Sequence, residues 1–317
     1  MIDPPDMHTE ADLQLAFPEP GAEPDKATTR QALDELFHLT CQYKSSRAYD
    51  DLLKFIARFR FYAPFNAMLV HVQMPGARFV APPSRWLRDY SRRIKPGARA
   101  IVILQPMGPV MFVFDVSDTE PGKDAPPLPR EVEKPFEVRG GKVGGELIRT
   151  IENAQRDGVR ISIRDAGSQS AGAIGPAKSS GSLKVLTRHK PEPTHVSVPL
   201  RYELLLNSQH SCEARYATLV HELAHLYCGH LGTPNPKWWP DRRNLPYTVR
   251  EFEAESVCFL VCRRLGIDNP SDEYLAGYVT EKSEVPPISL ECVMTASGLI
   301  EKMGRERLKP RKERDTE

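Results

Sequence analysis

The segment from residue 219 to 230 contains the sequence His-Glu-Leu-Ala-His, which constrains the fold of this chain more than any other stretch. His221 and His225 are four residues apart, so on a helix their side chains project from the same face. Two imidazoles presented in this way can bind one zinc ion, and Glu222 beside them can act on water at that ion. Apolar residues continue a helical pattern up to Gly229, a residue type that commonly ends helices. The motif therefore predicts a helix that presents a metal site.

A third protein ligand is expected downstream, because a catalytic zinc ion ordinarily has three protein ligands and a water. The segment 250–266 predicts a second helix, acidic at its beginning and apolar after that. Glu251 and Glu255 share one face of it and Glu253 points to the opposite side, so the expected order of preference is Glu251, Glu255, Glu253. Whichever of Glu251 and Glu255 is not a ligand can orient a ligand histidine. The alternative is a solvated first turn, where acidic residues are ordinary.

His230 is a rival ligand, because it follows His225 by five residues. The zincin pattern with three histidines has a Gly three residues after the second His and the third His three residues later. Cys228 and Leu231 occupy those positions, which argues against metal binding by His230.

The expected ligand set predicts peptide-bond hydrolysis with Zn²⁺. Two neutral imidazoles and one carboxylate leave the zinc site with a net positive charge, which acidifies bound water and polarises a substrate carbonyl. Glu222 is the expected general base, which takes a proton from water and delivers it to the leaving amine. The candidate donors to a developing oxyanion, each more often a surface residue, are Arg242, Arg243, Tyr247 and Arg250.

Size and composition allow two domains. The chain has 317 residues, and its formal net charge of +1 gives no overall attraction to nucleic acid. We expect no membrane association, since no stretch is long and apolar enough to span a bilayer and the amino terminus lacks the apolar core of a signal peptide. The six cysteines form no Cys-x-x-Cys pair and are expected to be reduced thiols, which favours a cytoplasmic location.

Composition divides the chain into five segments. The expected segments are a disordered Pro-rich extension (1–28), a first domain (29–117), a Pro-rich linker (118–135), a second domain with the metal motif (136–303) and a charged tail (304–317). Hydrophobic periodicity predicts helices over 46–61, 66–73 and 147–155, strands over 99–104, 110–116, 159–163, 182–187 and 194–199, and a Gly/Ser/Ala-rich loop over 167–181.

Basic residues dominate between residues 44 and 99, where 12 Lys and Arg are opposed by three Asp and interleaved with aromatic residues. Basic groups neutralise phosphates and exposed aromatic rings stack on unpaired bases, so this composition favours single-stranded nucleic acid. In the alternative interpretation the aromatic rings form the core of the domain and the basic residues its solvated face. The candidate nucleic-acid contacts are Arg58, Arg60, Arg88, Arg92, Arg93 and Trp86.

Several segments resemble the ImmA/IrrE and ArdC group of zincin-like proteins. The motif at 221–225 followed by Glu-Phe-Glu-Ala-Glu-Ser at 251–256 resembles their metal site. The segments 62–69, 86–87, 95–101 and 113–119 resemble the amino-terminal domain of ArdC proteins. The resemblance covers most of residues 30–270.

This resemblance implies an α+β protein, with a zincin-like metallopeptidase domain preceded by a smaller α+β domain of the ArdC type. It implies Zn²⁺ bound by His221, His225 and a downstream Glu. In the ImmA/IrrE branch that Glu stands four residues before an Asp or Asn, which matches Glu251 and places Glu255 at the second position.

The resemblance also implies two functions. ImmA/IrrE proteins act on repressor-type regulators, so a peptide bond in a transcriptional regulator or other partner protein is the expected substrate. ArdC proteins are antirestriction proteins of mobile elements whose first domain binds single-stranded DNA. The alternative is therefore a DNA-binding antirestriction protein whose zinc site is structural or vestigial.

Overall fold

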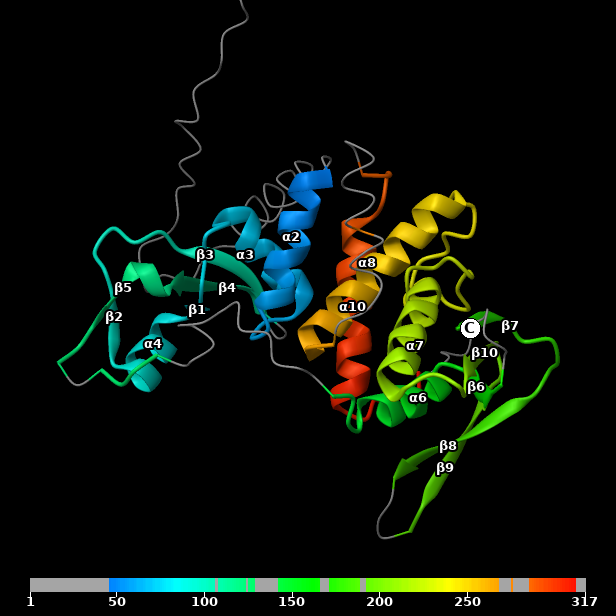
Figure 1. Ribbon diagram of the computed structural model, residues 1–317. Helices are drawn as coiled ribbons and strands as arrows, with labels where there is room; N and C mark the ends of the chain where they lie inside the picture. The colour runs from blue at the N-terminus through cyan, green and yellow to red at the C-terminus, as the bar shows by residue number, and fades with distance from the viewer. Residues whose placement is uncertain are drawn as a thin grey trace, which may run out of the picture. The chain divides into compact units, whose positions relative to one another are not determined.

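The chain is a mixture of α-helices and β-strands whose contacts divide it into two units (Figure 1). The computed structural model describes residues 46–105, 108–123, 125–128, 142–165, 171–188, 192–267, 275 and 285–311. Unit 1 comprises Met1–Cys41 and Val72–Pro127, and unit 2 comprises Gln42–His71 and Leu128–Glu317. The extension expected at 1–28 and parts of the expected linker and tail, 129–135 and 312–317, lie outside the described residues.

Unit 1 is built on a three-stranded antiparallel sheet of order β1-β4-β3. Its strands are β1 (Val80–Ala81), β3 (Ile101–Gln105) and β4 (Gly108–Asp115), and a ribbon of β2 (Arg92–Ile94) and β5 (Thr119–Pro121) adjoins the helix α4 (Pro83–Tyr90). Asp115, at the end of β4, is buried and accepts hydrogen bonds from the backbone N–H groups of Arg78, Phe79 and Ser117. One carboxylate thus provides an acceptor for two backbone donors before β1 and caps the 3-10 turn Val116–Asp118 that follows β4.

Unit 2 contains the metal motif and is rich in helices. They are α2 (Ser46–Arg58), most of α3 (Pro64–Gln73), α6 (Glu146–Arg156), α7 (Cys212–Tyr227), α8 (Tyr247–Leu265) and α10 (Leu290–Arg305). α10 packs against α6, α7 and α8, and α7 packs along α8. Within the described residues, no helix is long and apolar enough to cross a membrane.

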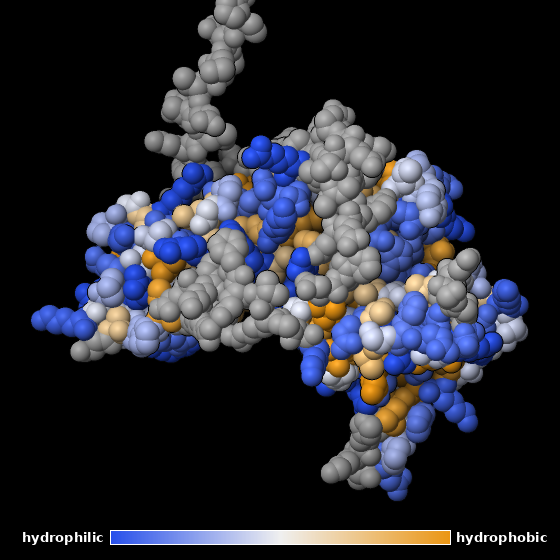
Figure 2. All heavy atoms as spheres, viewed as in Figure 1, coloured by the Kyte–Doolittle hydropathy of each residue, from blue (hydrophilic) through white to orange (hydrophobic). Residues whose placement is uncertain are grey.

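The helix α2 belongs to unit 2, which differs from the sequence-based boundary that placed residues 29–117 in one domain. The physical reason is its apolar face. Leu52, Leu53 and Ile56 are buried, and the ring of Tyr49 lies 5.5 Å from that of Phe252 on α8. The opposite face of α2 is covered by hydrophilic side chains (Figure 2). A partner helix nearly 200 residues later in the chain cannot be identified from local periodicity.

The sheet of unit 2 has the order β6-β10-β7, with β10 (Tyr202–Asn207) parallel to β6 (Val159–Arg164) and antiparallel to β7 (Gly172–Pro176). A separate antiparallel ribbon pairs β8 (Ser182–Arg188) with β9 (Thr194–Pro199). The prediction of a loop over 167–181 was wrong for β7. A Cβ on Gly172 would lie 2.6 Å from both the carbonyl oxygen of Leu205 and the Thr218 side chain, so close packing, rather than a need for flexibility, accounts for this glycine.

Arg264, near the end of α8, joins three helical segments of unit 2. Its buried guanidinium donates hydrogen bonds to the carbonyl oxygens of Ile56, Phe59 and Tyr62, where α2 ends, and forms an ion pair with Glu301 on α10. Carbonyl groups at the end of a helix lack intrahelical partners, so this side chain supplies donors where α2 ends.

We expect Arg264→Met to lower the free energy of unfolding by about 3–5 kcal/mol, because it removes the buried partner of Glu301, which keeps only the exposed Arg305, and the donor to three carbonyl groups. Urea unfolding followed by circular dichroism measures this change. Lys302→Met, at an exposed position of α10, is the control and should change stability by less than about 0.5 kcal/mol. Equal stability of the two variants would contradict the role given to Arg264.

Candidate metal centre

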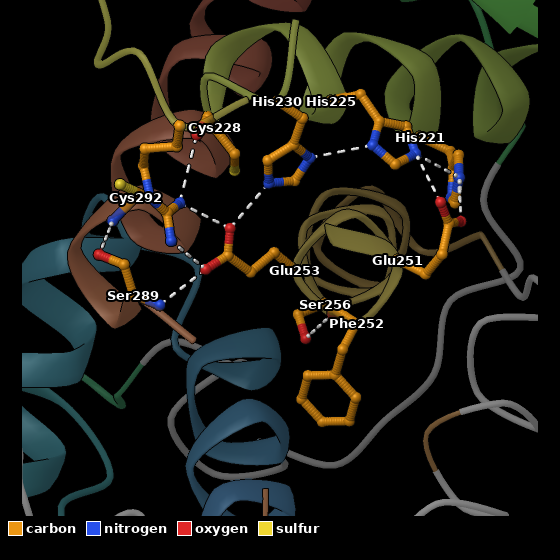
Figure 3. A network of polar contacts seen from close by, with 11 residues as sticks. His221, His225, Cys228, His230, Glu251, Phe252, Glu253, Ser256, Ser289 and Cys292 are labelled. Atoms are coloured by element: carbon orange, nitrogen blue, oxygen red, sulfur yellow. Dashed lines mark hydrogen bonds and ion pairs between the residues drawn. The ribbon is translucent and has the colours of Figure 1, made fainter. Parts of the chain in front are cut away.

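Two neighbouring helices bring the predicted ligands together. His221 and His225 come from α7, and Glu251 comes from the first turns of α8 (Figure 3). The Nε2 atoms of the two histidines are 3.2 Å apart. Oε2 of Glu251 lies 3.6 Å from Nε2 of His221, and its Oε1 lies 3.5 Å from Nε2 of His225. The three side chains form one of two clusters in the described residues that could hold a metal ion.

The spacing of these atoms suits a small tetrahedral ion. Bonds of ~2.0–2.1 Å from nitrogen and oxygen to zinc place tetrahedral ligand atoms ~3.3 Å from one another. The two nitrogens are 3.2 Å apart, and each has a Glu251 oxygen at a similar distance, Oε1 at 3.5 Å from His225 and Oε2 at 3.6 Å from His221. The arrangement fits zinc, although other divalent ions accept the same donor atoms.

Glu255 lies on the same face of α8 as Glu251 and approaches the other nitrogen of His221. Its Oε1 is 3.4 Å from Nδ1 of His221. A carboxylate at Nδ1 favours a proton there, which leaves Nε2 with its lone pair directed at the metal position. The structure thus places Glu251 beside the Nε2 atoms of both histidines and Glu255 beside Nδ1 of His221.

Electrostatics make the two histidines unequal before metal binds. Burial lowers the pKa of His221, but the hydrogen bond with Glu251 and the charge of Glu255 outweigh it and raise that pKa to about 9. For His225, burial and the neighbouring charge of His221 lower the pKa to about 4. At neutral pH and without metal, His221 is therefore the positively charged histidine of the pair and His225 the neutral one.

Glu222 follows His221 on α7 and faces the edge strand β7. Its Oε2 accepts a 2.9 Å hydrogen bond from the backbone N–H of Ile174. Burial raises the pKa of this carboxyl above its usual value, opposed by the charge of His221 and the hydrogen bond from Ile174. A carboxylate whose pKa is raised binds a proton more readily, as a general base requires.

The second cluster consists of Cys228, His230 and Glu253, all buried. Glu253 and Glu251 lie on opposite sides of α8, as their spacing in the sequence predicts (Figure 3). Both oxygens of Glu253 are already engaged by Arg242, with two contacts of 2.7 Å. His230 contacts Nδ1 of His225, on the side of the ring away from the Nε2 atom that faces His221 and Glu251. No sequence pattern indicates this contact, because it depends on the turn that follows α7.

The predicted oxyanion donors occupy different environments. Arg242 is held by Glu253, and Arg243 forms an exposed ion pair with Asp241, so neither is oriented toward the ligand triangle by these contacts. Tyr247 is 67% exposed at the beginning of α8. Arg250 adjoins Glu251, and its charge adds a small contribution to the lowered pKa of Glu251, which burial opposes and the contacts with His221 and His225 mainly cause.

The predicted nucleic-acid contacts are divided between the two units. Trp86 has 0% exposure and donates a hydrogen bond to the carbonyl oxygen of Phe114, so its predicted stacking on a base was wrong. Its ring packs against Phe79 and Tyr90, which is the core alternative for these aromatic residues. Arg58 and Arg60 belong to unit 2, whereas Arg88, Arg92 and Arg93 belong to unit 1. Arg88 is paired with Asp89, Arg92 binds Thr119, and Arg93 is exposed.

Comparisons with known proteins give little further information. No family model matches the chain, and no curated protein matches it. Among solved structures, the chain is similar to a metal-free crystal structure of the antirestriction ArdC protein from plasmid R388. The identity is 15%, the alignment covers 76% of this chain and 82% of that one, and the TM-score is 0.32. At this TM-score the likeness does not establish a common fold.

The raised pKa of His221 predicts that metal affinity rises with pH. Below pH 9 His221 carries a proton on each ring nitrogen, and it must lose one of them to bind metal through Nε2. The apparent zinc affinity should therefore increase about tenfold per pH unit until the pH approaches 9. Competition with a chelator at several pH values, corrected for the chelator's own protonation, measures this slope. A pH-independent affinity between pH 6.5 and 8.5 would show that His221 is not protonated in the metal-free protein.

Proposed function

We propose that unit 2 is a zinc-dependent peptidase with a zincin-like fold, in which His221, His225 and Glu251 hold the metal and Glu222 is the general base. The observation that carries the proposal is the convergence of the three ligand atoms beside a carboxylate that is itself oriented by a hydrogen bond. A structural zinc site has no need of that additional carboxylate. Zinc, when bound, would supply a Lewis acid that activates water and polarises the substrate carbonyl.

Residues of the chain would then transfer the proton, orient a ligand histidine and stabilise the oxyanion. Oε2 of Glu222 accepts the hydrogen bond from Ile174, which leaves Oε1 to take a proton from water and pass it to the leaving amine. Glu255 orients His221 through Nδ1. Tyr247 and Arg250, at the beginning of α8, are the remaining candidates for donors to the oxyanion.

The edge strand β7 supports a peptide as the substrate. Hydrogen bonds from Asn207 N to Ala171 O and from Ala177 N to Arg201 O show that odd-numbered residues of this segment face β10. The even-numbered Ile174 therefore turns its N–H away from β10, toward Glu222. Among the described strands, β7 pairs only with β10, so an extended peptide added along its outer edge would pass Glu222. The resemblance of the sequence to ImmA/IrrE proteins suggests a transcriptional regulator as the partner.

Glu222→Gln should remove peptidase activity and retain the metal. It keeps an oxygen that can accept the Ile174 hydrogen bond but cannot take a proton, so we expect cleavage to fall at least about 100-fold with zinc content unchanged. Zinc-loaded protein incubated with a mixed-sequence peptide library, read by mass spectrometry, measures cleavage, and elemental analysis measures zinc. Glu213→Gln, at the start of α7, is the matched control. The proposal fails if the wild-type protein leaves the library intact or if Glu222→Gln cleaves it equally fast.

A second candidate function is the binding of single-stranded DNA by unit 1, with a structural or vestigial zinc site in unit 2. Its support is the group of exposed basic residues in unit 1, which are Arg78, Arg88, Arg93, Lys95 and Arg99. Because Trp86 is buried, it cannot stack on a base, so the affinity for DNA would come mainly from phosphate contacts. The resemblance of the sequence to ArdC proteins adds the antirestriction role to this candidate.

Phosphate binding predicts a strong dependence on salt. We expect the affinity of the full chain for a fluorescent oligothymidylate, measured by anisotropy, to fall steeply between ~50 and ~200 mM NaCl. The double variant Arg93→Glu and Arg99→Glu should weaken binding and reduce the logarithmic salt slope by about 0.7 for each phosphate that the protein no longer neutralises. Lys237→Glu, in an exposed loop of unit 2, should have no effect. Absence of binding at the lowest salt would eliminate this candidate.

A further inference from the structure

His230 lies behind the candidate metal site and contacts one of its ligands. Its Nδ1 is 2.9 Å from Nδ1 of His225, and its Nε2 is 2.9 Å from Oε2 of Glu253 (Figure 3). The side chains of His230 and Glu253 have no solvent exposure. His225, His230, Glu253 and Arg242 therefore form a continuous chain of polar contacts, which we call the His230 relay.

The donors in this relay can be assigned from its outer end. Arg242 donates to both oxygens of Glu253 at 2.7 Å, and the backbone N–H of Ser289 donates to Oε1 at 2.7 Å. Arginine carries only donors and a permanent charge, so Glu253 is a carboxylate and accepts from Nε2 of His230. With the Nε2–H of His230 donated to Glu253, the Nδ1 of His230 accepts from Nδ1 of His225. His225 is then left with its lone pair on Nε2, the atom that faces His221 and Glu251.

The backbone after α7 is shaped to build this relay. Gly229 has φ of +83°, and a Cβ at this position would lie 2.1 Å from the carbonyl oxygen of Pro240. Only glycine fits this left-handed turn, which carries His230 back toward His225. The same turn accepts a 2.8 Å hydrogen bond at Gly229 O from the backbone N–H of Arg242, which brings Arg242 beside Glu253.

The same residues are poorly suited to a second metal ion. Each oxygen of Glu253 already accepts two hydrogen bonds, and the Arg242 guanidinium occupies the position of a counter-ion. A divalent cation bound by Cys228, His230 and Glu253 would have to displace these donors and sit beside a permanent positive charge. Because the charges of Arg242 and Glu253 already neutralise each other, these residues are better suited to support the neighbouring site than to bind a metal ion themselves.

We propose that His230 is a positioning residue, which Glu253 and Arg242 hold in place so that it fixes the tautomer and ring orientation of His225 for metal binding. This inference rests on the proposed metal site at His221, His225 and Glu251. Partners of this kind hold a ligand histidine and increase its basicity, and their removal commonly costs metal affinity.

Two substitutions of His230 test the relay in the full chain. His230→Met fills a similar volume but offers no acceptor of comparable strength to His225, so we expect zinc affinity to fall about 10- to 100-fold. His230→Gln has an amide oxygen for His225 and an amide nitrogen for Glu253, so it should restore affinity to within about threefold of wild type. Chelator competition measures zinc affinity. The visible absorption spectrum of the Co²⁺-loaded protein reports ligand geometry, and it should change in His230→Met and resemble wild type in His230→Gln.

A control variant distinguishes loss of the His230 relay from general destabilisation, and the wild-type protein tests the metal site separately. Ser297→Ala removes a buried hydrogen bond on α10, and it should lower thermal stability without altering zinc affinity or the Co²⁺ spectrum. If His230→Met does not fold, His230→Leu, which also lacks an acceptor for His225, replaces it. A wild-type zinc affinity and Co²⁺ spectrum in the Met or Leu variant would overturn the relay. Failure of the wild-type protein to bind zinc or Co²⁺ would instead overturn the metal site.

Discussion

The burial of the Glu253 carboxylate is the constraint on which the metal-site region depends. Removing a charge from water costs several kcal/mol unless the protein supplies equivalent hydrogen bonds. Here those bonds join four separate segments: His230 after α7, Arg242 in the following loop, Ser289 at the start of α10, and α8 itself, which carries the carboxylate. Satisfying this one group therefore fixes the position of α8 relative to α7, and with it the approach of Glu251 to the two histidines.

The parts of the site that repeat at helical spacing could be predicted from the sequence. His221 and His225, and the opposite directions of Glu251 and Glu253 on α8, follow from the 3.6-residue period. The role of His230 could not be predicted in this way, because its position depends on the left-handed turn at Gly229 and on the loop near Pro240. The failure of His230 to match the register of known three-histidine motifs pointed away from the metal, and it carried no indication of the contact with His225.

The fold shows the same division between local and distant information. The strands β3, β4, β6, β8 and β9 lie close to their predicted positions, because each has a clear apolar pattern between turn residues. β7 could not be identified because its glycines are typical of a loop. Gly172 is instead required by the close approach of β10 and α7. Trp86 was misinterpreted because an aromatic residue among arginines has the same composition whether it is exposed or forms the core. Only the packing of α4 against the sheet of unit 1 distinguishes the two.

The hydrogen bond between Ile174 and Glu222 affects which segments can pair with the outer edge of β7. An uncovered edge strand offers its outward N–H and C=O groups to any extended segment, including that of another copy. On β7 the outward positions are Gly172, Ile174 and Pro176; proline has no N–H, and the N–H of Ile174 is engaged by Glu222. Of these three positions only Gly172 has an N–H for an added strand, whereas all three have an outward C=O. A strand that joins this edge, whether a peptide substrate or a segment of another copy, must therefore bind mainly by donating its own N–H groups. The contact that orients the candidate general base thus also limits which segments can pair with β7.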